Sequence, residues 1–275
     1  MLSNVERPDL PSSYESTKTL PKVAWKTGTS YGHRDAWSIG YTPELTIGVW
    51  VGNFDGHGVP ALVGSEVAAP ILFDLFGFIV LRGVLTQEQI SKLRSTIRGG
   101  TEQFPPVPQS EGPLHWDVIW RDLLDLPVIS ELMECLIGNP NLLKARKEKY
   151  EVPLPTFRLD HINVHTHVSK GFEGGRLHGG WNGTAGLYRY DNGVMYNGLT
   201  TVTFELFDTK PNNGGFACVP GSHKANLQLP DKWRDLSKGV NECVERVAAK
   251  PGDAIVFTEA LTHGTLPWEV DEKRT

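Results

Sequence analysis

Two histidines far apart in the chain, His178 and His263, could act as metal ligands, because histidine is a residue type that commonly binds metal ions. In the two-histidine, one-carboxylate facial triad, a His-x-Asp or His-x-Glu pair and a distant histidine hold Fe(II) on one face. The remaining positions stay open for a cosubstrate and oxygen. Here Gly180 stands where the carboxylate of the pair is expected. The pattern therefore predicts an iron site whose third ligand must come from elsewhere.

Glu205 is the glutamate that we predict as the substitute ligand. On a strand, Thr201, Thr203 and Glu205 share one face. A glutamate among Phe204, Leu206 and Phe207 needs a partner if it is buried. The alternative is that Glu205 is a solvent-facing residue of an edge strand.

A second group of histidines, His161, His165 and His167, falls on one face of a predicted strand because their spacing has a period of two. They either line a wet cavity or face solvent, and we expect them to line the mouth of a substrate site. An alternative metal set combines His165 and His167 with Glu173 and His223, although this glutamate is one residue too far along for the cupin pattern.

The elements that must position these residues change character along the chain. Residues 77–85 predict an apolar strand, Thr86 predicts the cap of a helix over 88–97, and a second amphipathic helix is expected over 120–137. Strands and turns dominate afterwards, which favours a mainly β fold, a double-stranded β-helix (jelly roll) with helices packed outside. The expected strands cover residues 157–168, 198–208, 245–249 and 254–258.

The first 75 residues predict a small antiparallel β appendage. Two strand-like runs at 23–30 and 45–52 flank a third at 35–41, and a helix is expected over 65–76. We therefore divide the chain into an N-terminal segment, 1–75, and a jelly roll, 76–275.

Residues 77–275 resemble the phytanoyl-CoA dioxygenase family of Fe(II)/2-oxoglutarate oxygenases. The motifs that match are the strand 77–85, the run from Leu206 to Gly215, Val219-Pro-Gly-Ser-His-Lys224, and Gly252-Asp253 with the following strand and His263-Gly-Thr265. The resemblance implies that His178 and His263 bind iron and that Arg274 binds the distal carboxylate of 2-oxoglutarate, as a guanidinium fork suits. It also predicts that the jelly roll is truncated after Thr275.

The chemistry that this resemblance implies is the oxidation, as in hydroxylation, of a small organic substrate, coupled to decarboxylation of 2-oxoglutarate to succinate. Gly180 leaves two alternatives open. In the halogenases of the family a small residue at this position makes room for a halide, and a chain without the carboxylate could also be a catalytically defective binding module. His223, after its Pro-Gly turn, is expected to satisfy nearby backbone groups and not to bind metal.

Residues 1–75 resemble the C-terminal end of the transpeptidase domain of class A penicillin-binding proteins, type 1C. Lys26-Thr-Gly28, the run from Gly32 to Trp37 and the run from Gly48 to Asn53 carry the match. Acylation in that family needs a Ser-x-x-Lys pair, and this chain contains none. The segment is therefore expected to be a remnant or the product of a fusion.

Composition fits a cytoplasmic protein. The chain has 39% hydrophobic and 21% charged residues and a net charge of −5, without a basic block that would suit nucleic acid. Three widely spaced cysteines do not form a disulfide framework. No apolar run is long enough for a signal peptide core or a membrane span.

Overall fold

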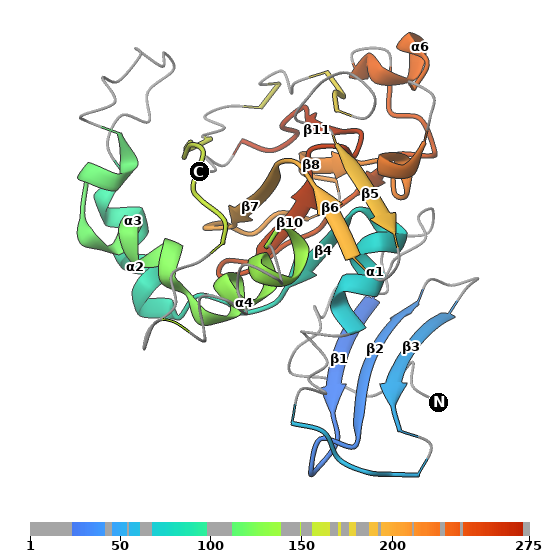
Figure 1. Ribbon diagram of the computed structural model, residues 1–275. Helices are drawn as coiled ribbons and strands as arrows, with labels where there is room; N and C mark the ends of the chain where they lie inside the picture. Colours follow the sequence, from blue (N-terminus) through green and yellow to red (C-terminus); the bar gives the residue numbers. More distant parts are fainter. Residues whose placement is uncertain are drawn as a thin grey trace, which may run out of the picture.

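The computed structural model describes most of the chain after residue 23. The β-structure of the described part consists of three three-stranded sheets and one hairpin (Figure 1). The described residues are 24–41, 46–53, 55–60, 68–97, 112–138, 149, 156–165, 170–171, 176–179, 187–191, 194–210, 212–225, 229–236 and 239–271.

The N-terminal sheet is the predicted meander. Strands β1 (Ala24–Thr29), β2 (Asp35–Tyr41) and β3 (Thr46–Gly52) pair antiparallel in chain order. Helix α1 (Ala69–Phe76) follows, and its Leu72 packs with Ala68 against Val49 of β3. The helix therefore covers one face of this small sheet, which Figure 1 shows in blue beneath α1.

The central sheet has the order β4-β10-β7 and lies between helices and a second sheet. Its strands are β4 (Phe78–Leu81), β10 (Ala254–Thr258) and β7 (Thr200–Phe204), all antiparallel. Every residue of β10 is buried, since Ala254 and Val256 face the helices whereas Ile255 and Phe257 face the second sheet. A strand buried on both faces reads as a continuous apolar run, as this one does.

The second sheet has the order β11-β8-β9 and faces the central one. It contains β11 (His263–Leu266), β8 (Gly215–Cys218) and β9 (Glu245–Arg246). The rings of Phe216 and Phe257 lie 4.6 Å apart between the sheets. A hairpin of β5 (Tyr188–Asp191) and β6 (Val194–Asn197) completes the β-structure of the described residues. Two facing antiparallel sheets with helices outside confirm the predicted jelly-roll class.

The helices confirm one prediction and correct another. Helix α2 (Gln87–Thr96) begins as expected, because the Thr86 hydroxyl accepts from the Gln89 backbone N–H at 3.2 Å and the Gln89 side chain accepts from the Thr86 N–H at 2.9 Å. The continuous helix predicted over 120–137 is wrong. Leu126 is extended because it precedes a proline. This breaks the segment into α3 (Val118–Asp122), a 3₁₀ turn (Leu123–Asp125) and α4 (Pro127–Leu136).

The strand predicted over 157–168 is also wrong within the described residues. Residues 156–165 belong to no strand, and 166–168 lie outside the described residues. The alternation survives without a ladder partner, because Ile162 and Val164 pack against the cluster around α2 and α3 while His161 and His165 are exposed. The alternation of apolar and polar residues therefore predicted correctly which side chains are buried, but it did not predict whether the segment pairs as a strand.

The Pro220-Gly-Ser-His223 turn ties the end of α1 to the jelly roll. The Nε2–H of His223 donates to the Asp74 carbonyl at 2.9 Å, and the Gly221 N–H donates to the Phe76 carbonyl at 2.9 Å. Both carbonyls belong to the last turn of α1, where helical partners are missing. The structural role predicted for His223 is confirmed.

The Gly252-Asp253 pair performs a similar task at the start of β10. The Asp253 carboxylate accepts from the Gly83 and Lys250 backbone N–H groups at 3.0 and 2.8 Å and pairs with Arg82 at 2.5 Å. The motif therefore fixes β10 against the end of β4. In the part of the chain that the structure describes, no helix is both long and apolar enough to cross a bilayer.

Candidate metal centre

His178 and His263 lie directly opposite one another in an isolated antiparallel bridge. Each backbone N–H donates to the other residue's carbonyl at 2.8 Å. Opposed residues of an antiparallel pair place their side chains on the same face. The two imidazole rings accordingly lie 4.4 Å apart between centroids. Backbone pairing thus brings together the two histidines that the sequence predicts as ligands.

Both rings have the same nitrogen engaged by the backbone. His263 Nδ1 lies 2.7 Å from the Leu261 carbonyl, and His178 Nδ1 lies 3.1 Å from the Arg176 carbonyl. A ring nitrogen that faces a carbonyl must carry the proton and donate it. In the neutral imidazole the lone pair is then on Nε2, the arrangement found in metal-binding histidines whose other nitrogen is held by an outer partner.

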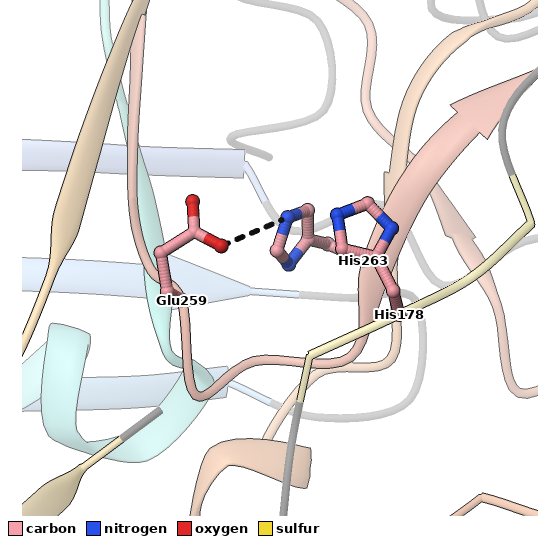
Figure 2. A group of neighbouring side chains, drawn as sticks. All are labelled: His178, Glu259 and His263. Atoms are coloured by element: carbon pink, nitrogen blue, oxygen red, sulfur yellow. Dashed lines mark ion pairs between the residues drawn. The ribbon is translucent and has the colours of Figure 1, made fainter. Parts of the chain in front are cut away.

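A carboxylate that sequence reasoning missed completes this group. Glu259 follows β10 directly, and its Oε2 lies 3.6 Å from His263 Nε2. One potential ligand atom each from His178, Glu259 and His263 falls within 4.8 Å of the other two. Figure 2 shows the carboxylate and the two imidazoles converging. The signal in the sequence was a glutamate four residues before the distal histidine. It lies in a turn, where no periodicity indicates in which direction a side chain points.

Gly179 is the second residue that sequence reasoning missed. It has φ of +86°, and a Cβ there would press against the carbonyl oxygen of Leu261, the acceptor for His263. Only glycine adopts this conformation readily and leaves room for the approach. The glycine after His178 therefore allows the two histidine segments to pair.

The site is buried on one side and exposed to solvent on the other. His263 is 5% exposed and packs against Phe257 with ring centroids 4.6 Å apart. Burial lowers the pKa of His263 below 6.5, opposed by its hydrogen bond to Leu261 and by the charge of Glu259. His178 is exposed. A neutral imidazole at the buried edge and access from the His178 side suit a centre that admits small molecules.

The structure does not bring Glu205 to the two histidines. Glu205 and Asp253 adjoin at the start of β10, where the Glu205 N–H donates to the Asp253 carbonyl at 2.9 Å. Glu259 follows the other end of that strand. Five residue steps from 253 to 258 span about 16 Å in a strand, more than a glutamate side chain can reach. Glu205 is 5% exposed, so the alternative of a solvent-facing edge residue does not describe it either.

The other predicted residues are placed only in part. His161 and His165 are exposed, with His161 Nδ1 2.8 Å from the Asp160 carboxylate. His167, Glu173, Gly180 and Arg274 lie outside the described residues. His223 is held by its hydrogen bond to the Asp74 carbonyl of α1. The substrate and cosubstrate roles assigned from the sequence therefore remain predictions.

Comparisons with solved structures find the same fold in a protein that has been solved with a metal ion and 2-oxoglutarate bound. HygX from Streptomyces hygroscopicus, with nickel and 2-oxoglutarate bound, has a TM-score of 0.54 at 20% identity and covers 74% of this chain and 81% of that chain. HygX with iron bound has a TM-score of 0.52 at 21% identity, covering 78% and 84%. At this identity the likeness establishes the fold.

The N-terminal part matches different proteins. Penicillin-binding protein 1C of Escherichia coli is 46% identical over 66 residues, which is 23% of this chain and 9% of that protein. Penicillin-binding protein 1A of Aquifex aeolicus is 42% identical over 57 residues, 19% of this chain and 7% of that protein. The chain thus spans less than a tenth of the length of these relatives.

The jelly roll matches a protein family over most of its length. Residues 109–274 match the phytanoyl-CoA dioxygenase (PhyH) family, which is more than half of the 275 residues. The match contains His178, Glu259 and His263, the three residues that meet in the structure. The chain therefore belongs to the phytanoyl-CoA dioxygenase family.

Proposed function

We propose that the jelly roll is an Fe(II)- and 2-oxoglutarate-dependent oxygenase that oxidises a small organic molecule. The observation that carries the proposal is the bridge between His178 and His263. It places two imidazoles side by side with both Nδ1 atoms bound to carbonyls, so both Nε2 atoms can ligate. Family membership supports the same reaction class.

The residues present fit Fe(II). Two imidazole nitrogens with a carboxylate oxygen nearby form the donor set of non-haem Fe(II) oxygenases. When bound, Fe(II) with 2-oxoglutarate supplies an oxygen-dependent oxidation of a substrate C–H bond, coupled to the release of succinate and carbon dioxide.

The protein's own contribution is orientation and exclusion of water. The Leu261 and Arg176 carbonyls hold the rings of His263 and His178 in one tautomer. Phe257 and Phe216 cover the buried side of His263 at centroid distances of 4.6 and 6.1 Å. Reactants would enter from the exposed His178 side, since the apolar side is packed.

Individual residues would have further roles in this reaction. Arg274 would bind the distal carboxylate of 2-oxoglutarate, and His161, His165 and His167 would contact the substrate. HygX has also been solved with hygromycin B bound, which supports a small molecule as the kind of substrate that this fold accepts. Hydroxylation is the outcome we propose for the substrate.

The proposal also includes a cellular location and a role for the N-terminal segment. We place the protein in the cytoplasm because none of its three cysteines, Cys135, Cys218 and Cys243, which all lie in the described part of the chain, forms a disulfide. The N-terminal sheet, β1 to β3, would act as an appendage without transpeptidase activity, because acylation needs the Ser-x-x-Lys pair that the chain lacks.

An anaerobic titration tests the function. Fe(II) is added to the full chain with 2-oxoglutarate, and a weak visible charge-transfer band is expected on chelation. On admission of oxygen, succinate should form. Absence of both the band and succinate would refute the oxygenase proposal.

A further inference from the structure

We propose that Glu259 is the third protein ligand of the metal centre and that Thr201 positions it. This inference rests on the proposed function, because it concerns the same ion. It goes further by assigning the carboxylate that the sequence lacks at Gly180.

The backbone of Glu259 is fixed by the central sheet. The register between β10 and β7 pairs Phe257 with Thr201 and Thr258 with Thr200. Immediately beyond the last pair, the Glu259 N–H donates to the Leu199 carbonyl at 3.0 Å. The residue that follows β10 is thus held in place before its side chain makes any contact.

The carboxylate is oriented by one hydroxyl. The Thr201 Oγ1–H donates to Glu259 Oε1 at 2.6 Å, a short bond of the kind that charged acceptors make. Oε1 is thereby engaged on the side away from the histidines, and Oε2 is the oxygen nearest to His263 Nε2. An outer partner that orients a ligand in this way is a regular feature of metal sites.

The spacing between Oε2 and Nε2 suits a shared ion. At 3.6 Å the two atoms are too far apart for a hydrogen bond. Atoms that each bind an ion at about 2.0–2.2 Å can lie up to about 4.4 Å apart. All three ligand atoms lie within 4.8 Å of one another, so side-chain movements of less than about 1 Å would close the group on one ion.

Among the described residues, the Glu259 carboxylate forms no ion pair with a lysine or arginine. Its ion-pair partner there is His263. The Glu259 side chain is only 22% exposed, and that of His263 is 6% exposed. A partly buried carboxylate beside two imidazoles is stabilised by a cation, and a divalent ion at this point would supply that charge.

Co(II) binding to the full chain provides the test, with Co(II) absorption as the readout. We expect Glu259→Gln to weaken Co(II) affinity by at least about 100-fold and Thr201→Val to weaken it by about 10-fold. Thr201→Ser keeps the hydroxyl and should retain the wild-type affinity. Glu88→Gln, at an exposed position on α2, is the matched control and should bind Co(II) as wild type does.

The outcomes separate the two proposals. If wild type does not bind Co(II), the proposed function fails. If wild type binds and a folded Glu259→Gln variant binds equally well, the ligand assignment is overturned and the function stands. Loss of affinity in Glu205→Gln but not in Glu259→Gln would overturn it as well. So would wild-type affinity that depends on chloride and not on Glu259, since a halide would then complete the site.

Discussion

His223 should make the stability of the protein fall in mild acid. The ring is 6% exposed and its Nε2–H donates to the Asp74 carbonyl, whereas its Nδ1 is buried and has no hydrogen-bond partner among the described residues. Protonation would create a charge with an unpaired donor in an apolar setting. Burial therefore lowers the pKa of His223 from 6.5 to about 4. Replacing His223 with Gln removes this titration.

The direction and size of the effect follow from the pKa. Between pH 6.5 and 4 the unfolded chain binds a proton at this position that the folded chain does not. The stability that the neutral His223 ring contributes is therefore fully present above about pH 6.5 and is lost as the pH falls towards 4. A difference of about 2.5 pH units corresponds to about 3.4 kcal/mol, of which roughly 2.5 kcal/mol is lost by pH 4.5.

Urea unfolding at pH 7.5 and 4.5 measures this loss. Other groups also titrate in this range, so the quantity of interest is the difference between wild type and His223→Gln. Wild type should lose roughly 2.5 kcal/mol more than the variant. His115→Gln, at an exposed position, controls for the loss of a histidine as such. Equal losses of stability in wild type and His223→Gln would show that protonation of His223 does not destabilise the fold.

Three further predictions concern other parts of the chain. Burial raises the pKa of Glu245 to about 7, so its ionisation destabilises the fold as the pH rises from 4.5 to 7. Glu245→Gln should raise the free energy of unfolding above that of wild type by about 1–3 kcal/mol at pH 8 and by little at pH 4, as measured by urea unfolding. An equal gain at the two pH values would contradict this effect of Glu245 ionisation. Gly179→Ala forces a Cβ against the Leu261 carbonyl and should weaken Co(II) binding by at least about 10-fold in calorimetry, whereas unchanged affinity would show that the bridge is dispensable. A fluorescent penicillin should not label the chain covalently on a denaturing gel, and a labelled band would overturn the argument from the missing serine.

Local signals predicted much of the fold. The meander, the capped helix and the apolar strand β10 each depend on residues close together in sequence, and each is found. The helix over 120–137 failed where Pro127 outweighed the apolar periodicity. Of the strand predicted over 157–168, the described residues 157–165 form no strand, because alternation indicates which side chains are buried and not whether a neighbouring strand is available.

The site was predictable only where a pattern pointed to it. His178 and His263 were identified by type and order, and the structure pairs them. Glu259 was not identified, because its position depends on the register of β10 with β7 and on the turn that follows. The spacing of nearby residues predicts neither of these. Glu205 was preferred because it shared a strand face with threonines, yet the same register places it at the far end of β10.

Anomalous diffraction from a crystal of the protein soaked with Co(II) tests the proposed metal centre most directly. We expect one peak at about 2.0–2.3 Å from Nε2 of His178, Nε2 of His263 and a carboxylate oxygen of Glu259. A soaked crystal with no peak at this point, or with the ion bound by other residues, would contradict it.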